Sequence, residues 1–368
     1  MTDYNHLVKA SVLTQPVYEP GKPIEIVAAE HGLDPATIIK LASNENPLGC
    51  SPLAQEAAAQ ALAHCHLYPE SSAARLRAKL ATMRGLSADS FIVGRGSSEI
   101  IDLLCAAFVA PGIEVVMGSI AFASYKIGTL LHGGTPVEVP MRKDYAHDLD
   151  AMRAAITPAT RLVFLTSPNN PTGVANATAD ILAFARSLPD HVVLCIDGAY
   201  EEYLDETPDF APLVREGRRV LWARTFSKAY GLAGHRVGYG MANPALIRLL
   251  ERIKPVFNVT IPALAAAEAT LDDQGFVAHS RFINGMGRDQ LCSGCHELGL
   301  EVVPGNANFI MVRVGDGPGL FARLQARGMI VRPLAGYGMR EWLRVTIGTP
   351  EQNSRFVELL GGLLKARS

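Results

Sequence analysis

Four short apolar runs in the sequence each end in polar residues that can do chemistry. Together the four groups supply an amide, a carboxylate, a primary amine and several small hydrogen-bond donors. The groups are 167–173 after the run 161–166, 197–200 after 191–196, 225–228 after 220–224, and 94–99 after 91–93. Ligands of an open parallel sheet bind beyond the carboxyl ends of its strands. We therefore expect these four groups to surround one ligand.

The residue types match the needs of one cofactor, pyridoxal 5'-phosphate. It requires a lysine for a Schiff base, an acid at its ring nitrogen, a donor at its phenolic oxygen and an anion site for its phosphate. Lys228 can supply the amine and Asp197 the acid, and Asn170 and Tyr200 can reach the phenolic oxygen. A helix that begins after Gly96 would offer free backbone N–H groups to the phosphate. The other donors predicted there are Ser97, Ser98, Thr225, Ser227 and Arg236.

Each of these signals is weak when taken alone. An aspartate at a strand end is more often a helix cap, and Asn-Pro-Thr-Gly is an ordinary turn. The prediction rests on the joint occurrence of all the groups at strand ends in this chain order.

The elements that must position these residues alternate between short apolar runs and helical stretches from about Phe91 onward. Runs that are apolar on both faces and separated by crossover helices predict an α/β fold, with a mostly parallel sheet between two helical layers. After Pro255 a long helical region is followed by strands and helices of a smaller α/β domain. We predict an N-terminal arm over 1–44, a large domain over 45–255 and a small C-terminal domain over 256–368.

Composition and charge favour a cytoplasmic enzyme that acts on small molecules. The 34 Lys and Arg nearly balance the 36 Asp and Glu of the 368 residues, so no overall field attracts nucleic acid or an anionic membrane. We see no export signal and no apolar run long enough to span a bilayer. Six scattered cysteines predict free thiols, and we predict no metal site.

Two further motifs point to other chemistry but are weak. The run 292–296 has the C-x-x-C-H spacing of a haem attachment site, yet it lies in a predicted amphipathic helix, where packing explains it. Gly94 and Gly96 form only part of a dinucleotide fingerprint, because the third glycine and the ribose-binding acid are missing.

At this point the sequence resembles the fold type I aminotransferases, and within them the histidinol-phosphate aminotransferase group. The motifs that carry the resemblance are Asn170-Pro-Thr-Gly, Asp197-x-Ala-Tyr200 and Ser227-Lys228-Ala-Tyr-Gly-Leu-Ala-Gly-His-Arg236. Similar motifs occur at 18–23, 41–49, 68–69 and 342–348, so the resemblance covers nearly the whole chain.

The resemblance implies a role for each matched residue. Lys228 would bind the cofactor covalently, Asp197 would pair with the ring nitrogen, and Asn170 and Tyr200 would hold the phenolic oxygen. Phe122 would stack on the ring. The residues implied to hold the phosphate are Ser97, Ser98, Ser227 and Arg236, with Tyr68 reaching it from the other subunit of a homodimer. The N-terminal arm would pack on the small domain and on that subunit.

The resemblance also implies how substrates bind. Arg344 would bind the carboxylate of glutamate or 2-oxoglutarate in one half-reaction and the phosphate of the imidazole substrate in the other. The further substrate contacts are Tyr18, Asn46 and Arg332. For both arginines, a surface or interdomain ion pair is the alternative explanation.

The sequence departs from the group at three positions. Many relatives have Asp-Glu-Ala-Tyr where this chain has Gly198 after Asp197, and Ser-Asp-Glu where it has Ser98 before Glu99. His235 replaces an apolar residue beside Arg236. None of these changes removes a group that does chemistry.

Several functions remain open at this stage. The expected one is transamination between histidinol phosphate and 2-oxoglutarate, in which Lys228 acts as the general base. An aromatic-amino-acid aminotransferase is the strongest alternative, followed by a decarboxylase of an amino-acid phosphate. A cofactor-binding regulator without turnover is a third, and a nicotinamide dehydrogenase comes last.

Overall fold

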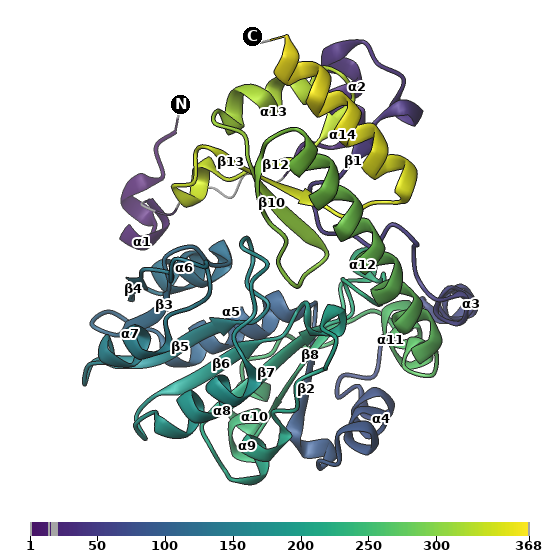
Figure 1. The fold of residues 1–368 in the computed structure, drawn as a ribbon. Helices are drawn as coiled ribbons and strands as arrows, with labels where there is room; N and C mark the ends of the chain where they lie inside the picture. Colours follow the sequence, from purple (N-terminus) through teal and green to yellow (C-terminus); the bar gives the residue numbers. More distant parts are fainter. Residues whose placement is uncertain (1, 14, 16–20, 367–368) are drawn as a thin grey trace.

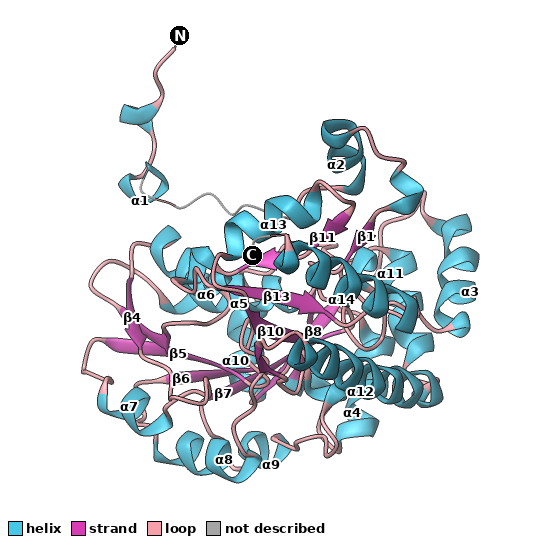
Figure 2. Cartoon of the chain, turned by 45° about the horizontal axis from the view of Figure 1, so that its top comes forward, coloured by secondary structure: helices cyan, strands magenta, loops and turns pink. Residues whose placement is uncertain are grey.

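The computed structural model describes residues 2–13, 15 and 21–366 of the chain (Figure 1). It shows the predicted α/β architecture, with a seven-stranded and a four-stranded sheet, each surrounded by helices, and a short two-stranded sheet. The first residues project from the body of the molecule (Figure 2). No helix in the described ranges is both long and apolar enough to cross a membrane.

The larger sheet has seven strands in the order β2-β8-β7-β6-β5-β3-β4. Their bounds are β2 Phe91–Gly94, β3 Glu114–Gly118, β4 Thr135–Val139, β5 Thr160–Thr166, β6 Val193–Asp197, β7 Val220–Thr225 and β8 Gly238–Ala242. The pairs within β4-β3-β5-β6-β7 are parallel, and β8 is antiparallel to both of its neighbours. The carboxyl ends of β5, β6 and β7 therefore meet at one edge.

Sequence patterns did not predict β4 and β8. Thr135 and Glu138 of β4 are exposed, so that strand lacks the apolar run of a buried one. The sequence of β8 is Gly-Tyr-Gly-Met-Ala, which contains none of the β-branched residues that favour strands. Tertiary pairing, and not local propensity, makes both segments extended.

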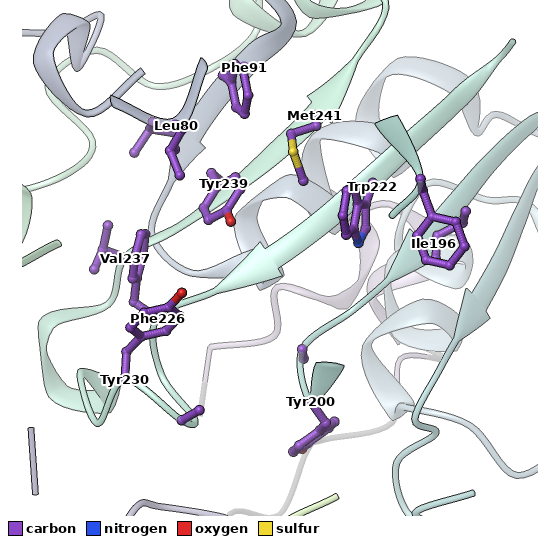
Figure 3. Packing of buried hydrophobic residues seen from close by; sticks show 14 of the residues in the cluster. Leu80, Phe91, Ile196, Tyr200, Trp222, Phe226, Tyr230, Val237, Tyr239 and Met241 are labelled. Atoms are coloured by element: carbon purple, nitrogen blue, oxygen red, sulfur yellow. The ribbon is translucent and has the colours of Figure 1, made fainter. Parts of the chain in front are cut away.

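The larger sheet has an apolar core on each face because side chains alternate along its strands. On β6, Leu194 and Ile196 belong to one core, whereas Val193 and Cys195 belong to the other. Figure 3 shows the first core, which includes Trp222 and the aromatic residues around Phe226. The covering helices are α3 Pro52–Ala61, α4 Ala74–Arg84, α5 Ser97–Phe108, α6 Ala123–Leu131, α7 Leu149–Ala154, α8 Thr178–Ser187, α9 Ala211–Arg215, α10 Pro244–Glu251 and α11 Ile261–Thr270.

The smaller sheet is antiparallel, with the order β12-β13-β10-β9. Its strands are β9 Glu301–Val303, β10 Phe309–Arg313, β12 Arg332–Pro333 and β13 Trp342–Thr346. It packs with α12 Gln274–Glu297, α13 Gly317–Gln325 and α14 Pro350–Lys365. Cys295 of the C-x-x-C-H run lies in α12 and packs in this core, and the described residues contain no cluster of three or more potential metal ligands.

The N-terminal segment packs mainly against this smaller domain. Short strand β1 Ile39–Lys40 pairs in parallel with β11 Met329–Ile330, and helix α2 Ile24–His31 packs Val27 and Ala28 next to Ile330. The four-residue helix α1 Ala10–Leu13 lies near α6 instead, where the Ser11 hydroxyl donates to the Leu131 carbonyl at 3.1 Å.

The packing of α11 bears on where the two domains meet. Ala263 and Ala267 of α11 belong to the core of the larger sheet, and α11 packs along α3. By contrast, Leu291 and Cys295 of α12 belong to the small-domain core. The two helices after residue 255 thus pack in different cores, and the boundary at residue 255 stays a prediction.

Candidate active site

A cavity of about 350 Å³ opens between the two sheets, at the carboxyl ends of β5, β6 and β7. We call it the main cavity. Its polar lining comes from both domains and from the N-terminal segment. The lining residues that matter below are Ser43, Asn44, Ser97, Ser98, Phe122, Thr166, Asn170, Asp197, Tyr200, Thr225, Ser227, Lys228, Arg236, Arg332, Tyr337 and Arg344. The four strand-end groups predicted from the sequence do surround one space.

Lys228 follows β7 and points its amine into this space. Its Nζ donates to the Ser43 carbonyl at 3.1 Å and lies 5.7 Å from the centre of the Tyr200 ring. Burial lowers the pKa of Lys228 to about 8, and the charge of Arg344 adds to the effect. A lysine with such a pKa is partly neutral near pH 7 and can act as a nucleophile or base.

We expect the reactivity of Lys228 to follow this lowered pKa. In cofactor-free protein, trace acylation of Lys228 should rise about tenfold per pH unit below pH 8 and level off above it, because only the neutral amine reacts. Mass spectrometry of the digested protein measures the labelling, and Lys143, which is exposed, reports the reactivity of the reagent. A Lys228 profile that still rises at pH 10 would contradict the assignment.

Asp197 is a buried carboxylate at the end of β6. Its Oδ1 accepts from the Ala199 N–H at 3.1 Å and its Oδ2 from the Tyr125 hydroxyl at 2.7 Å. It is 3% exposed, and burial raises its pKa. A buried carboxylate held only by neutral donors favours a cation beside it. The cavity thus offers an acid suited to a protonated ring nitrogen.

Tyr125 is a functional residue that the sequence patterns did not single out. It lies in α6, its ring stacks on Phe164 with centroids 4.4 Å apart, and the Thr166 hydroxyl lies 2.6 Å from its oxygen. The only sequence signal is its position three residues after Phe122, which places both side chains near one face of the helix. Tyr125 positions Asp197 and does not itself line the main cavity.

Replacing Tyr125 by Phe should shift the pH dependence of the enzyme. The phenol hydrogen bond opposes the effect of burial on the pKa of Asp197, so its loss raises that pKa further. The anionic form is then lost at a higher pH as pH falls, and the acidic limb of the kcat profile should move upward. At pH 7 we expect kcat to fall about tenfold. Tyr239→Phe, a buried tyrosine outside the main cavity, is the control, and an unchanged acidic limb in Tyr125→Phe would contradict this role.

The start of α5 forms an anion-binding cup. Gly96 precedes the helix with φ of 78° and without a side-chain cap, so the first N–H groups of α5 are available. The positive φ favours glycine at position 96, and a Cβ there would lie 2.7 Å from Arg236 Nη2 and would displace that guanidinium from the cup. Arg236 Nη1 donates to the Ser227 hydroxyl at 3.2 Å, and the Thr225 hydroxyl donates to Ser227 Oγ at 2.9 Å.

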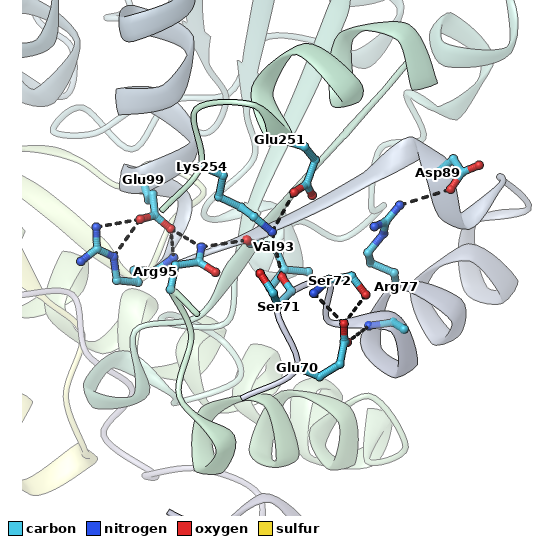
Figure 4. Close-up of polar contacts among 12 residues, drawn as sticks. Glu70, Ser71, Ser72, Arg77, Asp89, Val93, Arg95, Glu99, Glu251 and Lys254 are labelled. Carbon is cyan, nitrogen blue, oxygen red and sulfur yellow. Dashed lines mark hydrogen bonds and ion pairs between the residues drawn. The ribbon is translucent and has the colours of Figure 1, made fainter. Parts of the chain in front are cut away.

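The Glu99 carboxylate holds together the chain segments that form this cup (Figure 4). Its Oε2 accepts from the Arg95 N–H at 2.8 Å and from Asn258 Nδ2 at 2.6 Å, and Asn258 Nδ2 also donates to the Val93 carbonyl at 3.1 Å. The carboxylate therefore ties the end of β2 to the start of α5. Ser98, one of the three departures from the related group, lines the cavity beside it.

The opposite wall of the main cavity is built around Arg344 of β13. Its Nη1 donates to Asn170 Oδ1 at 2.5 Å and its Nη2 to the Ala42 carbonyl at 2.6 Å. Arg332 of β12 is the register partner of Arg344, so two guanidinium groups enter the cavity from neighbouring strands. Asn44 Nδ2 donates to the Tyr200 hydroxyl at 3.0 Å, and burial raises the pKa of Tyr200 to about 12.

Two of the predicted contacts do not line the main cavity of their own chain, and a third falls outside the described residues. Asn46 does not line the main cavity, because its amide donates to the Ala229 carbonyl at 2.9 Å and to the Ser280 hydroxyl at 2.8 Å. Tyr68 is 80% exposed and stacks on Phe257, so it does not reach the cavity of its own chain. Tyr18 lies outside the described residues.

Gly198, another departure, has a clear packing reason. A Cβ at position 198 would lie 2.2 Å from Glu201 Oε1. The Glu201 carboxylate is fully buried, pairs with Arg224 Nη1 at 2.7 Å and accepts from Trp222 Nε1 at 2.9 Å. The space next to the backbone at 198 is therefore filled by a carboxylate that has no room to move. His235, the third departure, does not line the main cavity.

Gly198→Ala should therefore destabilise the protein without touching the main cavity. We expect the free energy of unfolding to fall by about 1–3 kcal/mol, which is the usual cost of overpacking. Urea unfolding measures the change. Gly285→Ala in α12, where a Cβ meets nothing within 4 Å, is the matched control and should be neutral or stabilising. Equal stability of the two variants would contradict the packing argument.

Comparison with known proteins places this geometry among the aminotransferases. The family model described as aminotransferase class I and II matches residues 36–360. A histidinol-phosphate aminotransferase of Akkermansia muciniphila is 46% identical over 353 residues, which is 96% of this chain and 97% of the relative. Histidinol-phosphate aminotransferase 2 of Pseudomonas aeruginosa is 44% identical over 99% of both chains. The crystal structure of histidinol-phosphate aminotransferase from Sinorhizobium meliloti in complex with pyridoxal-5'-phosphate superposes with a TM-score of 0.90, at 26% identity and 98% coverage of both chains.

Proposed function

Because the chain belongs to the class I and II aminotransferase family, we propose that it transfers the amino group between histidinol phosphate and 2-oxoglutarate, in the biosynthesis of histidine. The products are imidazole acetol phosphate and glutamate. The observation that carries this function is the placement of Lys228, Asp197 and two arginines around one cavity. The relatives named above, which are similar over nearly their whole length, support the substrate.

The cofactor is pyridoxal 5'-phosphate, and the cavity residues fit it. The hydrogen bonds to Asp197 from the described residues come from two neutral donors, and a protonated ring nitrogen would add a cation in contact with the carboxylate. The cup at Gly96 and Arg236 suits the phosphate, and Asn170 and Tyr200 lie beside Lys228 for the phenolic oxygen. When bound, the cofactor supplies an electron sink that stabilises negative charge at the reacting carbon.

Each of the following cavity residues then has a separate role in the reaction. Lys228 anchors the cofactor, and its Nζ, with a pKa near 8, takes the proton from Cα of the amino donor and gives it up again as general base and acid. Asp197 holds the proton on the ring nitrogen through a carboxylate kept in place by Tyr125. Phe122, which precedes α6 and lines the cavity, would cover the ring of the bound cofactor.

The substrate binds to the arginines on the small-domain side of the main cavity. Arg344 binds the carboxylate of glutamate or 2-oxoglutarate in one half-reaction and the phosphate of the imidazole substrate in the other, since a planar guanidinium binds either oxyanion through two donors. Arg332 is the second contact, from the neighbouring register position. Tyr18 and Asn46 remain predicted contacts. If Asn46 takes part, its amide must first leave Ala229 and Ser280.

We also propose that the enzyme works as a homodimer in the cytoplasm. Tyr68 and Phe257 form a stacked pair that is largely exposed, next to Val256, which is 75% exposed. An exposed aromatic pair of this kind suits a protein interface, and a partner's copy of it would bring Tyr68 to the phosphate cup. All six cysteines are free thiols, which suits a reducing compartment.

A comparison of amino donors tests the function. Purified enzyme is given 2-oxoglutarate with histidinol phosphate, phenylalanine or tyrosine, and glutamate formation is followed. We expect kcat/KM for histidinol phosphate to exceed the others by at least about 100-fold, because its phosphate carries more charge and more acceptor oxygens for the two arginines than the single carboxylate of phenylalanine or tyrosine. Equal or better turnover of phenylalanine or tyrosine would instead identify an aromatic aminotransferase. Carbon dioxide release without an oxo-acid acceptor would identify a decarboxylase.

A further inference from the structure

A second cavity, separate from the main one, is rich in arginine. It has a volume of about 280 Å³ and lies among the end of α4, the segment after β6, the end of β7 and the start of α12. It shares no lining residue with the main cavity. Its polar lining consists of Arg84, Glu202, Thr207, Arg224, Tyr230, Gln274 and Arg281. We call it the arginine cavity.

The floor of the arginine cavity carries buried polar atoms that lack partners. Arg224 is 1% exposed, pairs through Nη1 with Glu201 and through Nη2 with Glu202, and yet its Nε has no hydrogen-bond partner in the described part of the chain. The same holds for Glu202 Oε2. An unmet donor and an unmet acceptor at one buried site are costly. Neither atom has accessible surface as the side chains stand, so a bound group reaches them only when the Arg224 or Glu202 side chain shifts.

The walls add two cations without carboxylate partners. The guanidinium of Arg84 lies over the Trp222 ring at 5.0 Å, and that of Arg224 lies 5.2 Å from the same ring. Figure 3 shows Trp222 and Tyr230 in the surrounding core. Arg281 donates to the Leu204 carbonyl at 3.4 Å, and no described carboxylate forms a salt bridge with Arg84 or Arg281. Three guanidinium groups around the cavity thus face two carboxylates, Glu201 and Glu202, both of which pair with Arg224.

We propose that the arginine cavity is a binding site for a small oxyanion, a phosphate or carboxylate that also carries a hydrogen-bond donor. The oxyanion binds to Arg84, Arg281 and the Nε of Arg224, because guanidinium groups bind such oxygens through charge-assisted hydrogen bonds. The donor of the ligand satisfies Glu202 Oε2. A hydrogen phosphate or a hydroxy acid has both features.

The arginine cavity is connected to the main cavity through residues that are adjacent in sequence. Arg224 precedes Thr225, and Glu201 follows Tyr200, so both ends of the buried Glu201–Arg224 pair continue into residues of the main cavity. An anion that binds Arg224 would therefore bind next to residues of the cofactor site. The site is independent of which amino donor the enzyme uses.

Calorimetric titration of the holoenzyme with inorganic phosphate, and separately with the hydroxy acid malate, tests the proposal and distinguishes the two anion classes. Arg84→Ala and Gln274→Glu should each weaken binding of the anion about tenfold or more. Gln274→Glu is the variant least expected to disturb folding, because Gln274 is exposed at the first position of α12, where an acidic residue favours the helix.

Binding in the main cavity must be separated from binding here. Arg332→Ala weakens only the main-cavity contribution, so on that background the remaining isotherm should still respond to Gln274→Glu. Isotherms for both anions that are the same in the wild type and in Gln274→Glu would overturn the proposal. So would an Arg332→Ala enzyme that binds neither anion.

Discussion

Replacing Lys228 by Ala should lower kcat by at least about 10⁴-fold, the full range attributed to a positioned general base. Two losses combine in this variant. The amine that takes the proton from Cα is gone, and so is the covalent attachment of the cofactor. Stopped-flow kinetics of each half-reaction measures the first loss, and the visible absorption of the cofactor-loaded protein measures the second.

The fold should survive this substitution. Among the described residues, the Lys228 amine donates one hydrogen bond, to the Ser43 carbonyl, and Ala leaves the strands unchanged. Lys143→Ala, at an exposed loop residue, provides the matched control and should keep full activity. A Lys228→Ala enzyme that retained activity within tenfold of the wild type, with cofactor bound, would remove Lys228 from the mechanism.

Replacing Asp197 by Asn should lower kcat by about 10²–10³-fold, the usual cost of removing one preorganised electrostatic contact in a site. Asn has the same shape, and its carbonyl oxygen can still accept from Ala199. It has no negative charge, however, so it cannot stabilise a proton on the ring nitrogen. The loss should appear in the proton-transfer step, with KM changed far less than kcat.

Asp148→Asn is the matched control for this prediction. Asp148 also accepts a backbone N–H, from Ala151 at 2.9 Å, but it caps α7 and does not line the main cavity. We expect its kcat to stay within about twofold of the wild type, as for a surface substitution. If Asp197→Asn behaved like Asp148→Asn, the charge of Asp197 would have no part in the reaction.

The sequence could predict the half of the cavity that lies at strand ends. Lys228, Asp197 and Asn170 each follow an apolar run, and parallel strands bring their carboxyl ends together without further information. The larger sheet itself was predictable for the same reason, since its central strands β5, β6 and β7 are buried on both faces. The edge strand β4 and the antiparallel β8 carried no such signal.

The other half of the main cavity depends on contacts between segments that are far apart in the sequence. Asn44 and Asn46 both lie in the segment after β1, and local sequence cannot tell which amide faces the cavity. In the structure Asn44 adopts a φ of 55° and donates to Tyr200, while Asn46 turns toward Ala229 and Ser280. A left-handed turn at Asn44 determines that its amide, and not that of Asn46, lines the main cavity, and nothing in the local pattern indicates it.

Buried polar partners were equally hidden from the sequence. Tyr125 reaches Asp197 from α6, across 72 positions of the chain, and in sequence it reads as one more aromatic residue of an apolar helix face. The Glu201–Arg224 pair explains why Gly198 replaces a larger residue, but that explanation needs the coordinates of the carboxylate. Side-chain pairings of this kind follow from packing, which periodicity does not encode.

The most direct test of the account is to reduce the holoenzyme with borohydride, digest it and map the phosphopyridoxyl group by mass spectrometry. We predict a single modified side chain, Lys228, at one group per chain. A label on any other lysine, or none at all, would contradict the assignment of Lys228 as the residue that holds the cofactor and moves the proton.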